Sequence, residues 1–364
     1  MLSYLAPAES AVSRTRSLMR RMLLLCLFLL AAPASPAAAQ VDLYSGESVV
    51  ADQGAGERER ALPLALEQVL MKLSGLSQFA DRPLVEPSLG RAPSIVLSYS
   101  YRNVAVPGAD GGEATELRLV ARFAQAEVDE LVRALQLPLW QPERPALVTW
   151  LIIDDGGERR VMPIDFTDLM VSMADIAASR GLQVEWPEPG PEGEYAVDPA
   201  LLWGGYTEDL ASPDGKGVMI VAARREGPQW AVRTNLGYRG QQWAWRVEDV
   251  DLHRALTAVM QQAVDQVAAA NTIAADDLGS WQQDVTVSGL RDAADYWRLL
   301  GYLQALSVVD GVSVVSARPA AVTFRLALRA VPKYLEEALA ADGVVEWVES
   351  ESRYRLLETE PHDG

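Results

Sequence analysis

The segment from Arg58 to Gly75, RERALPLALEQVLMKLSG, has the clearest helical period in the chain. Apolar residues recur on one stripe, whereas Glu67, Gln68 and Lys72 fall on the other side. Gly75 stands where a helix needs a left-handed C-terminal residue. Because such a helix is not stable alone, its apolar face must pack against another layer, and the strand-like segments that follow predict a sheet. The apolar stripe consists of Leu62, Leu66, Val69, Leu70 and Leu73.

Pro63 interrupts this pattern. Proline is tolerated in the first turn of a helix or at a kink, so we expect a helix that begins near Leu62 or a turn at Arg58 that is offset from the rest. Arg58 lies one turn before Leu62, on the apolar side. This position predicts an inward arginine paired with a carboxylate, in a structural role.

The first 39 residues have the form of a secretory signal peptide. Four arginines precede an apolar run at residues 22–32, and small residues lead up to Ala39. The run is short for a membrane span, so we expect cleavage after Ala39, release into the periplasm and no stable membrane span afterwards; an uncleaved anchor is the alternative. Translation could start at Met1, Met19 or Met22. The arginines are Arg14, Arg16, Arg20 and Arg21.

Charge and cysteine content narrow the possible functions. The chain carries a formal charge of −18, and its first 39 residues hold four arginines and Glu9, a net charge of +3, which leaves −21 for the rest. This balance disfavours nucleic acid and anionic lipid as partners, and we interpret it mainly as a source of solubility, with attraction to a basic partner as the alternative.

The only cysteine, Cys26, lies in the predicted signal. The mature chain therefore has no disulfide, thiol nucleophile or thiolate metal site.

The remaining pattern predicts an α+β fold in three small domains, at residues 40–137, 145–272 and 280–358. The first reads as strand, helix, hairpin and helix. The second has a strand buried on both faces at 146–153, a helix, a strand, four strand-like runs and a closing helix from Asp249 or Asp251 to Asn271. The third reads as β-α-β-β-α-β, a ferredoxin-like order. The four runs are 200–207, 218–224, 230–238 and 242–247. Two connectors separate the domains, a proline-rich one at 137–145 and an acidic one at 274–279.

The first domain resembles the proteobacterial family catalogued as domain of unknown function 2066, best over residues 41–153. The resemblance implies an exported bacterial envelope protein. Because that family has no established catalytic residues, none is carried over to this chain. The resemblance rests on the strand at Val41, on Arg58, Ala61, Leu62, Ala65, Leu66, Val69, Leu70, Lys72, Ser74 and Gly75, and on Tyr99, Tyr101, the Phe123 strand and the segment LPLWQPERPALVTWLI at 137–152.

Two histidines follow the predicted signal. His362 lies in the C-terminal tail. His253 begins a predicted helix beside Asp249 and Asp251, which offers a carboxylate–histidine pair. We favour a surface histidine at a helix cap, because one histidine without a partner motif is rarely catalytic.

Two pairs of adjacent carboxylates are further candidates. Asp154 and Asp155 precede two glycines, and this sequence is typical of a turn; a calcium site would need alternating oxygen ligands. Asp276 and Asp277 read as a solvated linker. The chain has no GxSxG, HExxH or Gly-x4-Gly-Lys motif. We therefore predict no catalytic residue, no metal ligand and no cofactor.

Tryptophans gather in the second domain, at Trp203, Trp230, Trp243 and Trp245. Trp243 and Trp245 point to the same face of a strand. If that face is exposed, it is a possible ligand face for a sugar strand or a peptide. If the helix that ends at Asn271 covers it, the tryptophans belong to the core, the interpretation that we favour.

These observations favour an exported α+β protein without catalysis, which acts as a periplasmic adaptor or assembly factor for an unidentified envelope protein. A glycan- or peptidoglycan-binding module is the first alternative, motivated by the tryptophans. An acid–base enzyme is the second. It would use Asp154, Asp155 or His253, and it needs a cleft that brings two of these side chains together.

Overall fold

The computed structural model describes residues 41–79, 81–107, 113–142, 144, 146–191, 193–210, 215–318, 321–341 and 343–357. The predicted signal peptide with its cleavage site after Ala39, Cys26 and His362 lie outside the described residues. The chain contains both helices and strands, and the strands form several sheets, which confirms the predicted α+β class. The chain from Val41 on forms one compact unit. The predicted boundaries near residues 137–145 and 272–280 stay predictions.

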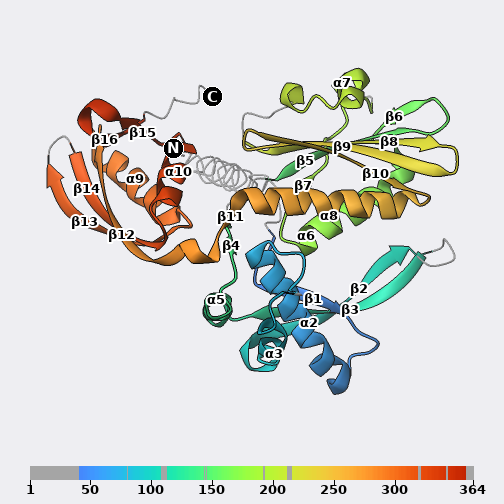
Figure 1. Cartoon of the computed structure of the whole chain (residues 1–364), viewed down its shortest axis with the longest axis horizontal. Coiled ribbons are helices and arrows are strands. Elements are labelled where there is room, and N and C mark those ends of the chain that lie inside the picture. The colour runs from blue at the N-terminus through green and yellow to red at the C-terminus, as the bar shows by residue number, and fades with distance from the viewer. Residues whose placement is uncertain are drawn as a thin grey trace, which may run out of the picture. The chain divides into compact units, whose positions relative to one another are not determined.

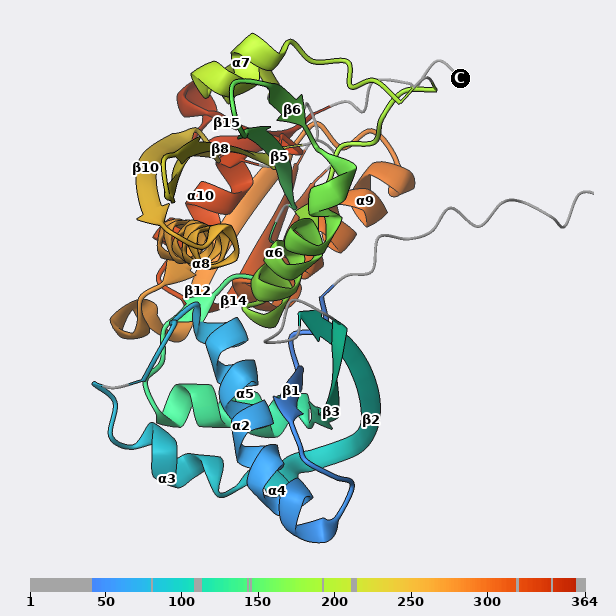
Figure 2. The same cartoon turned by 90° about the vertical axis from the view of Figure 1, so that its right-hand side faces the viewer.

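The first sheet is antiparallel, with the strand order β1-β3-β2. Helix α2 packs against β1 and β3, and the hairpin of β2 and β3 curves past it (Figure 2). The predicted apolar stripe of α2 is buried in this core. Two short helices, α3 and α4, were not predicted. The elements are β1 (Ser45–Val49), α2 (Ala55–Ser74), α3 (Val85–Leu89), α4 (Ala92–Ile95), β2 (Val96–Pro107), β3 (Glu113–Phe123) and α5 (Gln125–Ala134).

Helix α2 departs from its prediction at two residues. Pro63 lies inside the helix, which begins at Ala55. The proline deprives the Glu59 carbonyl of its amide donor, and because Glu59 is exposed, water can replace that donor. Lys72, predicted on the polar side, is only 7% exposed. Its Nζ donates to the carbonyl oxygen of Ser45 at 2.8 Å, since the start of the first strand covers this end of the helix.

The central sheet has the strand order β10-β9-β8-β5-β6, with β7 paired to β5. β5 and β8 are parallel and β9 and β10 follow as antiparallel hairpins. Helices α6 and α8 contribute to the core on one face, and α7 covers the opposite face (Figure 1). β5 is therefore buried on both faces. The elements are β5 (Leu147–Asp154), β6 (Arg159–Val161), α6 (Thr167–Ser179), β7 (Val184–Glu185), α7 (Pro199–Gly204), β8 (Gly217–Glu226), β9 (Gln229–Tyr238), β10 (Gln241–Asp249) and α8 (Leu252–Asn271).

The strand predicted at 200–207 is wrong, because helix α7 occupies this place. The Asp198 side chain accepts a hydrogen bond from the Ala200 amide at 2.8 Å, as an N-cap does. Pro199 is the first helical residue and Gly205, with φ 79°, ends the helix in a left-handed conformation. These end signals outweigh the apolar run between them.

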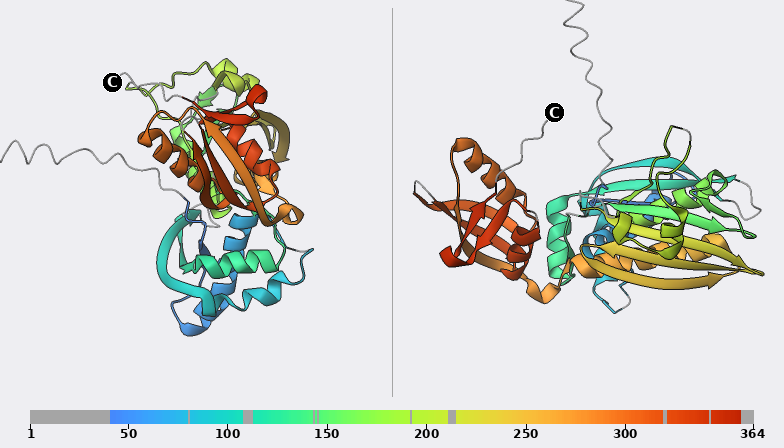
Figure 3. Two further views of the ribbon diagram at one scale, coloured as in Figure 1. Left: turned by 90° about the vertical axis from the view of Figure 1, so that its left-hand side faces the viewer. Right: turned by 90° about the horizontal axis from the view of Figure 1, so that it is seen from above.

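The C-terminal sheet has the order β13-β14-β12-β16-β15, and α9 and α10 pack on one of its faces (Figure 3). β16 is parallel to β12 and lies between β12 and β15. In a ferredoxin-like sheet the fourth strand would pair with the first, so the extra strand leaves the ferredoxin-like detail unconfirmed. The elements are β12 (Leu278–Ser288), α9 (Ala293–Ala305), β13 (Val309–Arg318), β14 (Ala321–Ala330), α10 (Lys333–Ala341), β15 (Val345–Val348) and β16 (Arg353–Leu356).

Two very short strands join the proline-rich connector to the residues just before the acidic one. β4 (Leu139–Trp140) pairs antiparallel with β11 (Thr272–Ile273). Short 3-10 turns complete the fold at Ile164–Phe166, Glu208–Leu210, Ala275–Asp277 and Glu349–Glu351. Within the described ranges, no helix has both the length and the apolar character needed to cross a membrane.

Candidate functional site

The face of β10 that carries Trp243 and Trp245, considered as a possible ligand face, is turned toward the core. Trp243 and Trp245 are half-buried and pack against the cluster that α8 shares with the central sheet. The Nε1 atom of Trp245 is buried, and none of the described residues accepts a hydrogen bond from it. The exposed side of this strand carries Gln242, Ala244, Arg246 and Glu248 instead. The two tryptophans therefore do not form an open aromatic platform.

Arg58 has an aromatic partner rather than the predicted carboxylate. Its guanidinium carbon lies 5.2 Å from the centroid of the Tyr99 ring on β2. The carboxylate of this turn, Glu57, bonds to Arg60 at 2.6 Å. The prediction of a structural ion pair was thus wrong in its partner, because the curved β2 strand brings a tyrosine over the start of the helix.

Asp154 is the last residue of β5, and Asp155 begins the turn that follows, which has two left-handed glycines. Asp154 is 6% exposed, and it accepts a hydrogen bond from the Gly157 amide at 3.0 Å and from Arg224 Nε at 3.1 Å. Asp155 lies 3.9 Å from Arg225. Asp154 therefore bridges a turn to a neighbouring strand.

His253 has a serine partner. Its Nε2 lies 3.0 Å from Ser172 Oγ on α6, and its backbone amide donates to Asp251, which caps α8. Asp249 bonds to Arg254 at 2.7 Å. Asp251 therefore acts as the helix cap that we favoured from the sequence, and Asp249, the other carboxylate considered for a pair with His253, binds Arg254 instead. Among the described residues, no three of His, Cys, Asp or Glu gather closely enough to hold a metal ion.

Asp277, predicted in a solvated linker, has two polar partners on α10. It accepts hydrogen bonds from Lys333 Nζ at 2.7 Å and from the Tyr334 hydroxyl at 2.9 Å. The bond from Lys333 is the main reason why the pKa of Asp277 lies below its usual value. The acidic connector is thus fastened to the last helix.

The proline-rich connector contributes to three cores within a few residues. Leu137 is buried in the core of the first sheet, Trp140 is buried under α8, and Leu139 packs against the C-terminal core. The Arg144 guanidinium lies 3.8 Å from the centroid of the Trp140 ring. We call Gly75, Trp140, Arg144 and Arg180 the junction, because these residues connect segments that are distant in the sequence.

Arginine side chains donate hydrogen bonds to the backbone carbonyl groups of the helix ends that meet at the junction. Arg144 donates to the carbonyl oxygens of Lys72 and Gly181, at 2.8 and 3.0 Å. Arg180 is 5% exposed and donates to the Gly75 carbonyl at 3.1 Å and to Asp265 at 2.8 Å. Helix C-termini leave carbonyl groups without amide partners, so these guanidinium groups stabilise the ends of α2 and α6. Sequence reasoning missed both arginines. The local signal for Arg180 was the helix-ending Gly181 that follows it, whereas Arg144 stands four residues after Trp140 in the proline-rich connector.

Gly75 confirms its predicted conformation, with φ 73°, and its amide donates to the Met71 carbonyl at 2.9 Å. It is also tightly surrounded, since an added Cβ would lie 2.9 Å from the Ala268 Cβ and 3.2 Å from Thr272 Oγ1. The glycine therefore serves both the helix end and the contact with α8.

We expect Gly75→Ala to lower the free energy of unfolding by about 2–3 kcal/mol, from left-handed strain plus the clash with Ala268. Gly240→Ala is the matched control, because Gly240 has φ 74° with open space around it. That variant should lose only about 1 kcal/mol. Urea denaturation measures both values, and equal losses would show that the contact with α8 is unimportant.

Lys72 makes stability depend on pH. Burial lowers its pKa below the ordinary 10.5. In the window between the lowered folded-state pKa and 10.5, the unfolded chain binds more protons, so stability rises with pH. We expect denaturation measured at a series of pH values up to 10.5 to show this rise in the wild type and a flatter profile in Lys72→Met. Lys333→Met is the control, because the pKa of Lys333 is raised by Asp277; it should keep the rise. An unchanged profile in Lys72→Met would contradict the assignment.

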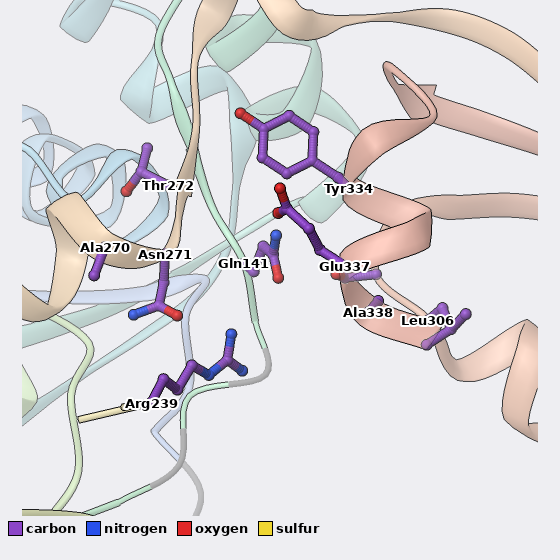
Figure 4. A pocket seen from close by; sticks show the side chains of 10 residues that line it. Gln141, Arg239, Ala270, Asn271, Thr272, Leu306, Tyr334, Glu337 and Ala338 are labelled. Carbon is purple, nitrogen blue, oxygen red and sulfur yellow. The ribbon is translucent and has the colours of Figure 1, made fainter. Parts of the chain in front are cut away.

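A small cavity with both polar and apolar walls lies beside the junction (Figure 4). Its volume is about 200 Å³. The walls come from the residue after β4, the turn between β9 and β10, the end of α8 with the start of β11, the segment after α9, and α10. The lining residues are Gln141, Arg239, Ala270, Asn271, Thr272, Leu306, Ser307, Tyr334, Glu337 and Ala338.

Comparison with known proteins corrects the family resemblance. A family model described as Domain of unknown function (DUF8605) matches residues 37–141, which are 105 of the 364 residues. This is a different domain from 2066; the helical stripe and hairpin that suggested 2066 are general features of small α+β layers and do not identify a family. No curated protein matches the sequence. A solved structure described as "Crystal structure of uncharacterized protein" is similar at 10% identity, over 35% of this chain and 88% of its own, with a TM-score of 0.17.

Proposed function

We propose that the protein is a non-catalytic adaptor or assembly factor of the cell envelope, exported to the periplasm by its N-terminal signal. The junction is the observation that carries this proposal. Leu137, Leu139 and Trp140 each enter a different core, so the connector is built as packed structure. Packing of this kind suits a protein that presents several surfaces to its partners.

Edge strands supply those surfaces. β2, β10 and β13 each end the strand order of a sheet, and an edge strand presents unpaired backbone donors and acceptors to which an extended partner segment can add. On β2, Leu97 is 68% exposed and Tyr99 47% exposed. These side chains would flank an added strand.

The residues considered for catalysis are engaged in other contacts. Asp154 is held by Arg224 and a turn amide, and Asp249 by Arg254. The half-burial of Trp243 and Trp245 also removes the observation that motivated the glycan-binding alternative. Both facts favour the adaptor over the two alternatives.

In-cell photo-crosslinking tests the proposal. A photoreactive residue is placed in turn at Leu97, Ala244 and Val314, one on each edge strand, and at Ile164 as the control, which is 90% exposed in a turn. We expect one edge to crosslink reproducibly to an envelope protein that the control does not capture. Equal products at all four positions, or turnover of cell-wall fragments by the purified protein, would contradict the proposal.

A further inference from the structure

The cavity beside the junction contains a buried acceptor without a partner. Asn271 is 5% exposed, and its Nδ2 donates to the Val267 carbonyl at 2.7 Å. Its Oδ1 is buried and receives no hydrogen bond from any described residue. In Figure 4 this oxygen is turned toward Gln141 and Arg239, on the side of the cavity. A buried polar atom without a partner is unfavourable, so a ligand that brings an N–H donor to it gains affinity.

A positively charged and a negatively charged side chain line the same cavity. Arg239 stands in the left-handed first position of the turn between β9 and β10, with φ 48°. Glu337 projects from α10 on the other side (Figure 4). Gln141 lies between them, and its backbone amide donates to the Asn271 carbonyl at 3.3 Å, which fixes the two walls of the cavity to each other. A ligand with one charge would meet a like charge on one wall.

We propose that this cavity binds a small zwitterion, a free amino acid. Its ammonium group donates to Asn271 Oδ1 and is attracted by the Glu337 carboxylate. The carboxylate of the amino acid faces Arg239, and the side-chain amide of Gln141 offers a further polar contact. The inference goes beyond the adaptor function, because it assigns a small-molecule site that an adaptor does not require.

The volume limits the ligand. At roughly 30 Å³ for each water, about 200 Å³ corresponds to six or seven water molecules. This space accommodates a small amino acid, whereas pockets for drug-sized ligands begin at about 300 Å³. A dipeptide should therefore bind more weakly than a single amino acid.

Calorimetric titration of the chain from Gln40 onward, which contains the whole compact unit, tests the proposal. The probes are alanine, alanine methyl ester, propionate and alanyl-alanine. We expect alanine to bind best, with affinity at least about tenfold lower for propionate, which lacks the ammonium group, and lower also for the ester, which lacks the carboxylate. No binding of alanine at about 10 mM, or equal binding of propionate, would overturn the proposal.

Three variants connect the binding to these residues. Asn271→Leu should weaken alanine binding by at least about tenfold, and Glu337→Gln by several-fold. Glu336→Gln is the matched control, because Glu336 is the preceding exposed residue of α10 and does not line the cavity. Thermal unfolding checks that each variant is folded, and if Asn271→Leu does not fold, the two glutamate variants decide. Equal affinities in Glu336→Gln and Glu337→Gln would contradict the assigned site.

Discussion

Replacing Trp140 by alanine is expected to lower the free energy of unfolding by about 3–5 kcal/mol, the usual loss for a large aromatic side chain in a core. Trp140 is completely buried, and the Arg144 guanidinium lies 3.8 Å from the centroid of its ring. The truncation would leave a cavity under α8 and remove the surface on which Arg144 rests. Because Arg144 also donates to the Lys72 and Gly181 carbonyls, the ends of α2 and α6 should loosen with it.

Urea denaturation and hydrogen exchange of the amides at the ends of α2 and α6 measure this loss. Trp297→Ala is the control, because Trp297 is 66% exposed on α9 and its removal should cost no more than about 0.5 kcal/mol. Trp140→Phe should retain most of the stability, since the Nε1 atom of Trp140 has no hydrogen-bond partner among the described residues. If Trp140→Ala were as stable as Trp297→Ala, the junction would not hold the chain together.

The sequence predicted correctly those helices and strands that are determined by neighbouring residues. The stripe from Leu62 to Leu73 and Gly75 identified α2, because helical periodicity and a left-handed glycine are read from adjacent residues. Helix α7 could have been found in the same way, from the Asp198-Pro199 start and the Gly205 end. The strand predicted there gave too much weight to the apolar run and too little to these ends.

The junction could not be predicted, because its contacts join residues that are distant in the sequence. Lys72 has a polar helical position, yet the backbone of the first strand buries it. Trp140 stands in a proline-rich segment that reads as a linker, and only the pairing of β4 with β11 places it under α8. Asn271 likewise looked like an ordinary helix end. Periodicity reports which face of an element is apolar, but it does not report which distant segment will cover a polar one.

The candidate chemistry shows the same limit. The turn after β5 was predicted from local composition, and Asp155 lies in it, but Asp154 is still part of the strand, and its Arg224 partner comes from β8, a parallel neighbour 70 residues later. His253 was placed at a helix start, but its Ser172 partner comes from α6. In an acidic chain carboxylates adjacent in the sequence are common by chance, so the partner that decides the role of each one is visible only in the fold.

Gly46→Ala tests the contact on which the first layer depends, and we expect a loss of roughly 3 kcal/mol or more. An added Cβ would lie 1.9 Å from the Ala65 carbonyl oxygen and 2.8 Å from its carbonyl carbon. Both atoms belong to the backbone of α2, so no side chain can turn aside to make room. The strand β1 would have to move away from the helix, and it would then lose its register with β3, where Gly46 stands opposite Ala121.

Hydrogen exchange should locate this damage in β1, while denaturation measures its size. The matched control is Gly56→Ala, because Gly56 lies in the first turn of α2 with open space around it. Alanine is the better helix former, so this variant should be as stable as the wild type or more stable by up to about 1 kcal/mol. Opposite signs for the same substitution would show that close packing of β1 on α2, and not glycine itself, sets the stability of this layer. A Gly46→Ala protein as stable as Gly56→Ala would mean that β1 does not approach the helix so closely.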